Sequence, residues 1–511
     1  MLLTASGTLG SRVLGLVRDR MIAGFFGTGP VSAALLFALS IPNLFRRLLG
    51  EGALTSALIP VMTAEKRKGG KAQAFRFLNQ VLTRAALLMA GITLAMMLAA
   101  WILSWHDGLE ERLRLSARLT ILCMPYMPLI CLTALFTAGL NILGRFGITA
   151  LSAVWLNIAM IALLAGAGYF VTQDETELAV WVCCGSLLGG LLQLCIPATM
   201  LWRTGWRPRF SLEKTDAWEQ LRRIFVPAIA GAGILQINFF VSRFLALNVD
   251  DQALTLYYIA NRVVEFPIGV FAIAVSTVVF PSMSRHAEHD DRDALGADFS
   301  HGMRLIFAIN IPAATGLIIL AAPIVRLLFE NRKFTEMDTL ATVPLLWIFA
   351  AAMPINGMLL MIGRGFNALK DTRTQARLAL WMFLLNLALS PLLAWHWGAV
   401  GLAIANSVCA VFQCVTLWCV LRKKEVIFAR ESLLKPLLQC TGASAVMGGA
   451  AWGLWQLCTP WIRGEDVSLG VQAIALFATI AVAALLYFTL LGWMHYPEHR
   501  FLLKMLRRPR Q

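Results

Sequence analysis

Charged residues are scarce in this chain: only 14% of its 511 residues are Asp, Glu, Lys or Arg, while 58% are hydrophobic. A soluble fold of this length could not hide so much apolar surface from water, so a soluble protein is excluded. Long apolar runs follow one another from end to end and leave no room for a soluble domain. The composition therefore predicts an all-α polytopic membrane protein.

Motifs of enzymes and metal sites are also lacking. The ten cysteines form no CxxC pair, and most lie within apolar runs, where small packing residues are expected. We find no P-loop, HExxH motif or nucleophile elbow, and the acidic run at 290–293 is the nearest approach to a lipid-phosphate transferase motif. Met1–Ser11 carries no basic residue, which argues against a secretory signal. We expect no catalytic residues, metal or cofactor.

About fourteen stretches are long enough to cross a membrane as helices, since each crossing needs about 20 residues. The predicted spans are 2–26, 33–62, 79–104, 117–140, 149–170, 178–202, 224–247, 253–284, 302–325, 339–362, 376–394, 398–421, 434–457 and 470–494.

A faint internal repeat suggests how these spans are grouped. The second span ends in Pro60-Val61-Met62-Thr63, and the eighth ends in Pro281-Ser282-Met283-Ser284, 221 residues later. Six spans separate the two copies, so both copies have the same orientation, as in parallel transporter repeats. We therefore predict two six-helix lobes, residues 1–210 and 211–430, around a central cationic cavity. Residues 431–511 add two helices and a basic tail.

The basic residues are distributed unevenly between the two membrane faces. When residues at span ends are counted with the adjoining connection, 29 of the 44 Lys and Arg lie on the even-to-odd connections and the C-terminal tail, and 7 on the others. This bias predicts that both termini are cytoplasmic. It also argues against nucleic acid as a partner, because the charge is spread over many loops that face anionic lipid.

Eight arginines remain inside the predicted spans and have no topological role. They are Arg12, Arg18, Arg20, Arg46, Arg47, Arg84, Arg243 and Arg262, against the acids Asp19, Glu51 and Glu265. An ion in the bilayer is costly and normally faces a partner or a watery cavity. The surplus of arginine favours an anionic substrate, and the planar guanidinium suits phosphate. We expect Arg84 to snorkel to the headgroups, and the role of Arg243 stays open.

Sequence spacing predicts local partners for several of these groups. Asp19 is next to Arg18, and Glu265 follows Arg262 by one helical turn, which is ion-pair spacing. Pro42 is expected to kink the second span just before Arg46. Elsewhere, Asn386 and Asn406 are expected to join helices by hydrogen bonds, and the Gly185–Gly189 spacing predicts close helix packing.

Two segments of the chain resemble a known family. Ser11-Arg12-Val13-Leu14-Gly15, Arg18-Asp19, Pro42-Asn43-Leu44-Phe45-Arg46-Arg47 and Glu51-Gly52-Ala53 are similar to the N-terminal signature of the MurJ (MviN) family. Asn261 to Val270, with Phe280-Pro281 after it, resembles the family's second motif. The signature begins close to residue 1, which favours a start codon farther upstream.

The resemblance implies a lipid II flippase of the multidrug/oligosaccharidyl-lipid/polysaccharide exporter superfamily, in the bacterial inner membrane. Its cargo would be undecaprenyl-pyrophosphate carrying the peptidoglycan disaccharide-pentapeptide. Carried over by motif, the substrate-binding residues would be Arg12, Arg18, Arg46, Arg262 and Glu265, with Asp19, Asn43, Arg47, Glu51 and Arg243 as secondary candidates.

The chain departs from the family pattern at two places. It has Ser32-Ala33-Ala34 where relatives often carry an Asp, and Asn261 where they often carry Asp before the arginine. These losses make the cavity more cationic and leave open any ion coupling assigned to the missing acids. The oligomeric state is also left open.

Three alternative functions differ in the charges that they require. A cation-coupled multidrug antiporter would use cavity carboxylates, which the arginine surplus disfavours. A flippase for another polysaccharide repeat unit shares the anionic diphosphate, so only the motifs disfavour it. A membrane glycosyl- or phosphotransferase would need a metal-binding acidic pair, which we do not find.

Overall fold

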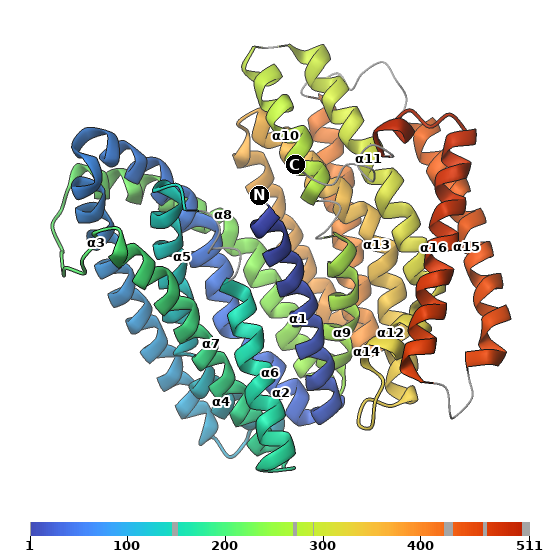
Figure 1. The fold of residues 1–511 in the computed structure, drawn as a ribbon, viewed down its shortest axis with the longest axis horizontal. Helices are drawn as coiled ribbons and strands as arrows, with labels where there is room; N and C mark the ends of the chain where they lie inside the picture. Colours follow the sequence, from blue (N-terminus) through green and yellow to red (C-terminus); the bar gives the residue numbers. More distant parts are fainter. Residues whose placement is uncertain are drawn as a thin grey trace. The chain divides into compact units, whose positions relative to one another are not determined.

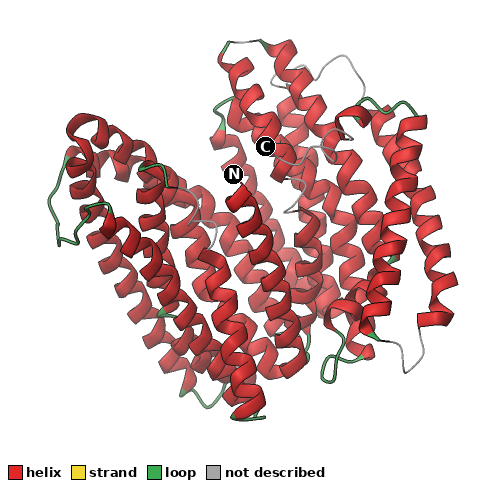
Figure 2. Ribbon diagram, in the orientation of Figure 1, coloured by secondary structure: helices red, strands yellow, loops and turns green. Residues whose placement is uncertain are grey.

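The computed structural model describes residues 2–145, 152–268, 273–289, 291–423, 433–462 and 468–502. In these ranges the chain is helical apart from short turns and loops, as Figure 2 shows. Two compact units divide the chain, Met1–Thr255 and Leu256–Gln511.

The first unit holds the helices drawn from blue to green in Figure 1. They are α1 (Leu2–Phe26), α2 (Pro30–Phe45), the π-helix η1 (Arg46–Ala53), α3 (Leu54–Ser104), α4 (Glu111–Cys123), α5 (Tyr126–Ile142), α6 (Ser152–Phe170), α7 (Glu175–Arg203) and α8 (Asp216–Leu247).

The second unit begins within α9 (Ala253–Pro267) and continues through the helices drawn from green to red. They are α10 (Ile273–Glu288), α11 (Arg292–Ile319), α12 (Ala321–Phe329), α13 (Glu336–Ala368), α14 (Thr372–Lys423), α15 (Leu434–Ile462) and α16 (Leu469–Trp493).

Each of the fourteen predicted spans is mostly helical over the residues that the structure describes, with breaks at Met124–Pro125 in the fourth span and at Leu320 in the ninth. Two long helices are interrupted where the backbone leaves helical geometry, at Gly69–Gly70 in α3 and at Trp397–Gly398 in α14. The break in α3 separates the end of the second predicted span from the third, and the break in α14 separates the eleventh from the twelfth. Gly70 has φ +66° and Gly398 has φ +54°, backbone angles that residues with a side chain rarely adopt. Eight described helices, or nine with the bent pair α4–α5, are long and apolar enough to cross a membrane on that criterion alone. The all-α membrane fold is thus confirmed.

Three predicted spans differ from their expected shape or bounds. The fourth is two helices, α4 and α5, bent by 41° around Met124–Pro125. Pro42 lies inside a continuous α2, and the irregularity comes after it, where Arg46 starts an eight-residue π-helix. The helix expected from residue 302 begins at Arg292, where Asp291 caps it by accepting from the Ala294 amide.

Glycines allow α6 and α7 to pack closely. A Cβ on Gly185 would lie 2.9 Å from the Met160 Cα, and one on Gly189 would lie 2.8 Å from the Leu156 Cα. Such distances are too short for a larger residue, so the predicted packing role of this spacing is confirmed.

Helix α8 packs on α2, α3 and η1, and so belongs with the first unit. The sequence repeat instead places the start of a second lobe at residue 211, before this helix. The difference has a simple cause: repeat symmetry describes the order of helices, whereas compactness reflects which neighbours a helix touches.

Helices α15 and α16 pack against each other and on α11 and α12. A proline explains one buried contact there. Pro312 has no amide hydrogen, so the Ala308 carbonyl lacks its usual donor within α11. The Tyr487 hydroxyl of α16 donates to this carbonyl at 3.0 Å. The contact ties the C-terminal helix pair to a weak point in the α11 backbone.

Candidate functional site

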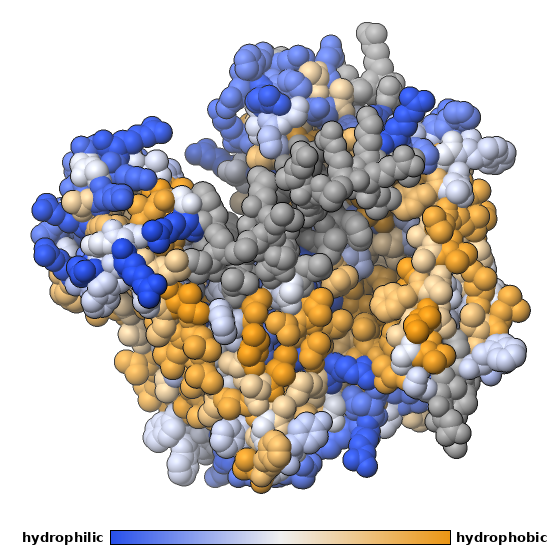
Figure 3. Space-filling view, in the orientation of Figure 1, coloured by the Kyte–Doolittle hydropathy of each residue, from blue (hydrophilic) through white to orange (hydrophobic). Residues whose placement is uncertain are grey.

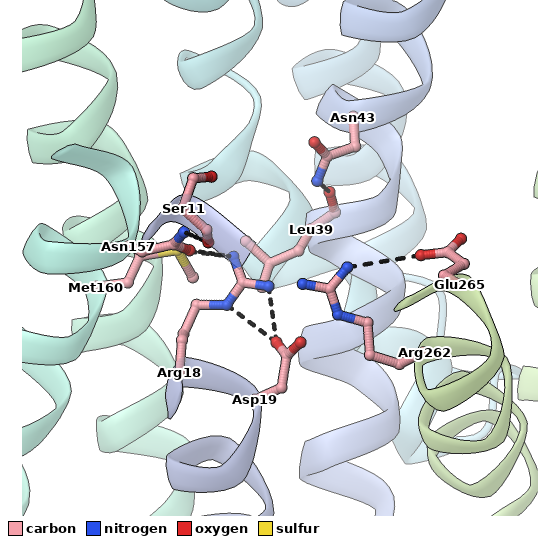
Figure 4. A network of polar contacts seen from close by, with 9 residues as sticks. All are labelled: Ser11, Arg18, Asp19, Leu39, Asn43, Asn157, Met160, Arg262 and Glu265. Carbon is pink, nitrogen blue, oxygen red and sulfur yellow. Dashed lines mark hydrogen bonds and ion pairs between the residues drawn. The ribbon is translucent and has the colours of Figure 1, made fainter. Parts of the chain in front are cut away.

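Arg18 of α1 is held by several side chains within the first unit (Figure 4). Its Nε and NH2 both donate to the Asp19 Oδ1, at 3.0 and 2.7 Å. Its NH1 donates to the Asn157 Oδ1 at 3.1 Å. The Asp19 side chain is 1% exposed and that of Arg18 is 18% exposed. The pair predicted from adjacency therefore exists, and the guanidinium is fixed in a largely buried place.

Asn157 of α6 is a site residue that sequence reasoning missed. It is 5% exposed, and its Nδ2 donates to the Ser11 carbonyl of α1 at 3.0 Å. One amide thus fixes both the backbone of α1 and the side chain of Arg18 (Figure 4). The available signal was an asparagine in an otherwise apolar span, because a buried amide must find partners.

Asn43 of α2 positions Arg46 at the start of η1. The Asn43 Nδ2 donates to the Leu39 carbonyl at 2.9 Å, and its Oδ1 accepts from the Arg46 Nε at 3.1 Å. The secondary candidate Asn43 is therefore bonded to a primary candidate. Arg46 is half-buried, as is Arg47 beside it.

Arg262 of α9 forms the predicted ion pair in the second unit (Figure 4). Its NH1 lies 3.5 Å from the Glu265 Oε2, and the two side chains are 29% and 40% exposed. Asn261 donates from Nδ2 to the Glu265 Oε1 at 3.1 Å. An Asp at 261 would instead place a second carboxylate beside Glu265. Asn261 therefore gives Glu265 a hydrogen bond where an Asp would cause charge repulsion.

The remaining candidates are placed less closely. Arg12 and Arg20 of α1 and Arg243 of α8 are half-buried. Glu51 lies in η1, and its side chain is outside the described part of the structure. The Arg84 NH2 donates to the Leu212 and Glu213 carbonyls of a neighbouring loop, and its expected reach to the lipid headgroups stays a prediction.

The charge balance of the spans favours anion binding. In the first unit six of the arginines singled out from the sequence, excluding Arg84, accompany two acids, Asp19 and Glu51. In α9 Arg262 and Asn261 share the carboxylate of Glu265 as their partner. Among the described residues, no group of three or more His, Cys, Asp or Glu could hold a metal ion. What these residues can do is bind a negatively charged group through guanidinium hydrogen bonds.

Asn386 and Asn406 join the two halves of α14. The Asn386 Nδ2 donates to the Asn406 Oδ1 at 2.8 Å, and the Asn406 Nδ2 donates to the Tyr257 hydroxyl of α9 at 3.1 Å. Ser390 also donates to the Asn386 Oδ1. The predicted hydrogen-bonding role of both asparagines is confirmed.

Comparison with known proteins assigns most of the chain to one family. The family model described as "Lipid II flippase MurJ" matches residues 22–472. A Haemophilus influenzae protein named "Probable lipid II flippase MurJ" is 30% identical over 522 residues, covering 97% of this chain and 100% of that protein. A Vibrio cholerae protein of the same name is 30% identical over 472 residues, covering 90% and 89%.

Solved structures share the fold. One described as "Lipid II flippase MurJ, inward closed conformation" has a TM-score of 0.79 at 22% identity, covering 98% of this chain and 99% of that one. An inward-facing multidrug resistance MATE family transporter of the MOP superfamily has a TM-score of 0.68 at 15% identity, covering 83% and 97%. At these identities the likeness concerns the fold alone.

Proposed function

This chain belongs to the MurJ family of lipid II flippases, and we propose that its intramembrane arginines bind the diphosphate of that lipid. The protein is a multi-pass transporter of the inner membrane rather than an enzyme, and it serves peptidoglycan biosynthesis. Its cargo is lipid II, undecaprenyl-pyrophosphate carrying the disaccharide-pentapeptide, which it moves from the cytoplasmic to the periplasmic leaflet.

The observation that carries the binding proposal is the fixed guanidinium of Arg18. Asp19 and Asn157 hold it in place, and both side chains are buried. A group that is already oriented loses little conformational freedom on binding, so more of the interaction energy remains for affinity. Arg46 and Arg262 are oriented in the same way, by Asn43 and Glu265. We infer that these three arginines, with Arg12, contact the diphosphate.

The transport cycle that we propose is alternating access. The cargo's diphosphate enters a cavity open to the cytoplasm, while the isoprenoid chain stays in lipid. Rearrangement then closes that side and opens the other, so that the diphosphate crosses the membrane without meeting hydrocarbon. We further propose that both termini lie in the cytoplasm, because the basic connections and the tail share one side.

The family assignment disfavours the two other transport functions that the sequence left open. A multidrug antiporter of the same superfamily shares the fold, since a MATE transporter has a TM-score of 0.68. It would need carboxylates for cationic cargo, and the basic excess favours the opposite charge. A flippase for another polysaccharide unit would use the same arginines, so it is distinguished only by the sugar and peptide that the protein accepts.

The experiment is a flipping assay with the purified full-length chain in proteoliposomes. We expect Arg18→Ala/Arg262→Ala to lower lipid II translocation at least tenfold, because loss of one charge-assisted contact costs about 1.5–3 kcal/mol. Unchanged transport by this variant would overturn the role of the arginines.

The matched control is Arg222→Ala/Arg223→Ala on α8. It removes the same number of arginines, which pair with Glu219 and have exposed side chains (60% and 78%). It should flip lipid II at the wild-type rate. Flipping of a diphosphate lipid with unrelated sugars at an equal rate would favour the polysaccharide alternative.

A further inference from the structure

The loop between α7 and α8 exposes an unusual combination of aromatic, aliphatic and basic side chains. We name these residues the α7–α8 loop surface: Trp202, Arg203, Arg207, Arg209, Phe210, Leu212 and Lys214, all exposed. The loop lies beside the upper part of α3, at the left of Figure 1. The loop backbone is held by contacts with α3 and α5, so the exposure of these side chains is a fixed feature of the surface.

A buried tryptophan fixes the first half of the loop. Trp206 is 4% exposed, and its ring packs edge-on against Phe136 of α5 with centroids 5.2 Å apart. Its Nε1 donates to the Asn79 Oδ1 at 2.9 Å, and the Asn79 Nδ2 donates back to the Arg207 carbonyl at 2.9 Å. The Asn79 side chain thus ties this part of the loop to α3 through two hydrogen bonds, one that it accepts and one that it donates.

A second set of contacts from α3 fixes the other half. The Ser211 amide donates to the Thr83 Oγ1 at 3.2 Å. The Arg84 NH2 donates to the Leu212 carbonyl at 2.8 Å, and its guanidinium stacks 4.4 Å from the Trp218 ring centroid. The side chains that point outward therefore do so from a defined backbone.

The exposed apolar groups suit a membrane interface better than water. Phe210 is 75% exposed, Trp202 51% and Leu212 50%. Trp202 and Arg203 end α7, a helix long and apolar enough to cross a membrane, so the loop follows directly on a span. Figure 3 shows this end of the first unit as hydrophilic above a band of hydrophobic helix surface. Aromatic residues are enriched at such a boundary.

The charge of the loop selects the kind of lipid. Residues 203–214 hold four basic residues and one acid, Glu213. Arg207 is oriented by stacking over Trp202, 5.2 Å from its ring centroid, and by donating to the Trp202 carbonyl at 2.9 Å. On α8, by contrast, Arg222 and Arg223 share Glu219 as a partner. The loop thus combines a surplus of positive charge with exposed apolar groups next to the end of a candidate span, a combination that suits the headgroup region.

We propose that the α7–α8 loop surface binds anionic phospholipid headgroups, with its basic residues on the phosphates and Phe210 and Leu212 among the upper acyl chains. The contact is independent of the cargo site, and it anchors the end of the first unit to the adjacent leaflet. Each basic residue near an anionic bilayer favours binding by about fivefold.

A photocrosslinking experiment tests the proposal on the full-length chain. Phe210→p-benzoylphenylalanine is reconstituted in nanodiscs of equal parts phosphatidylglycerol and phosphatidylcholine, and crosslinked lipids are identified by mass spectrometry. We expect phosphatidylglycerol to be enriched at least about fivefold over phosphatidylcholine. Arg207→Gln/Arg209→Gln in the same background removes two of the four basic residues and should lower the enrichment several-fold, whereas Arg222→Gln/Arg223→Gln should leave it unchanged.

Three results would overturn the proposal. Equal crosslinking of both lipids would show apolar contact without headgroup selection. An equal loss in both arginine double variants would show a response to overall charge rather than to this surface. Crosslinking to a protein instead of lipid in native membranes would assign the surface to a protein partner. Thermal unfolding of each variant checks that the loop retains its contacts, and because no cargo is present, the result is separate from the flipping assay.

Discussion

At the scale of single residues, the candidate site depends on amides as much as on arginines. Asn157 holds Arg18, Asn43 holds Arg46, and Asn261 shares Glu265 with the neighbouring arginine. An amide orients a guanidinium without cancelling its charge, whereas a carboxylate does both. Arg18 and Arg262 also pair with the carboxylates of Asp19 and Glu265, so the amide at Arg18 adds orientation without cancelling more of the positive charge that a diphosphate would meet.

This reasoning gives a prediction for Asn157. Asn157→Asp keeps an acceptor for Arg18 but adds a buried negative charge beside it, so we expect weaker lipid II binding, by about tenfold or more. Like Asn157→Leu, it also removes the Nδ2 donor to the Ser11 carbonyl, so the two variants differ in the acceptor and the charge. Asn157→Leu removes the acceptor as well as the donor to the Ser11 carbonyl. It should lower the free energy of unfolding by about 1–3 kcal/mol.

The two variants are compared by lipid II titration and by thermal unfolding in the same detergent. Asn238→Asp, on a different helix of the first unit, serves as the control for an added charge. Equal affinity for lipid II in wild type and Asn157→Asp would contradict the idea that a neutral partner at position 157 preserves the positive potential around Arg18.

The part of the site that sequence could predict is the part made by neighbours in the chain. Arg18 with Asp19, and Arg262 with Glu265, follow from one-residue and three-residue spacing along a helix. Asn157 is 139 residues from Arg18, so its partner depends on how α1 packs on α6. The protein partners of Arg84 could not be predicted for the same reason, since they lie 128 and 129 residues away.

At the scale of helices, hydrophobicity located the spans but not their breaks. Runs of about 20 apolar residues mark a crossing regardless of detail. The break at Met124–Pro125 and the π-helix after Pro42 depend on which backbone groups find partners elsewhere. Pro312 illustrates this, because its effect on α11 is offset by Tyr487 from a helix that follows much later in the sequence.

The last helices are also attached at the segment that follows α16, by a buried carboxylate. Glu498, whose side chain is 8% exposed, accepts from the Arg304 Nε at 2.6 Å and lies 2.9 Å from the His301 Nδ1 of α11. Burial alone would raise the pKa of Glu498, but His301 and Arg304 outweigh it and lower the pKa. The Tyr496 hydroxyl adds a hydrogen bond to the Arg304 carbonyl.

A pH dependence of stability follows from Glu498. Its pKa is lower in the folded chain than the value of about 4.3 expected when unfolded. Its contribution is therefore complete above about pH 4.3 and is lost as the pH falls through the lower folded value. At pH 7 we expect Glu498→Gln to be less stable than wild type by about 1–3 kcal/mol.

Thermal unfolding of both proteins in detergent between pH 7 and pH 3 measures the difference. It should shrink below about pH 4.3, because protonation makes the wild-type carboxyl resemble the amide. Glu219→Gln, which breaks an exposed pair on α8, should cost less than about 1 kcal/mol. A gap between Glu498→Gln and wild type that stays constant down to pH 3 would rule out the ionised carboxylate as its source.

At the scale of the whole molecule, charge separates two tasks. Most of the 44 basic residues lie on the predicted connections, where they favour one topology, whereas we propose that a few inside the predicted spans bind the cargo. The membrane potential acts on both the cargo and these arginines. In the alternating-access cycle proposed above, a diphosphate would leave a negative interior downhill, and the same field would draw the empty site with its arginines back toward that interior.

We therefore predict that lipid II flipping depends on membrane potential. Each elementary charge moved through 100 mV changes the free energy by about 2.3 kcal/mol, or about 50-fold at equilibrium. In proteoliposomes of one protein orientation, a potassium diffusion potential that is negative on the cytoplasmic face should accelerate outward flipping, and the reversed potential should slow it.

If Arg18→Ala/Arg262→Ala flips slowly but responds to the potential in full, the cargo alone carries the charge that is moved. If the response of this variant shrinks, the arginines move charge through the field during the cycle. An equal rate of wild-type flipping at both polarities would mean electroneutral transport and would remove the membrane potential as the driving force.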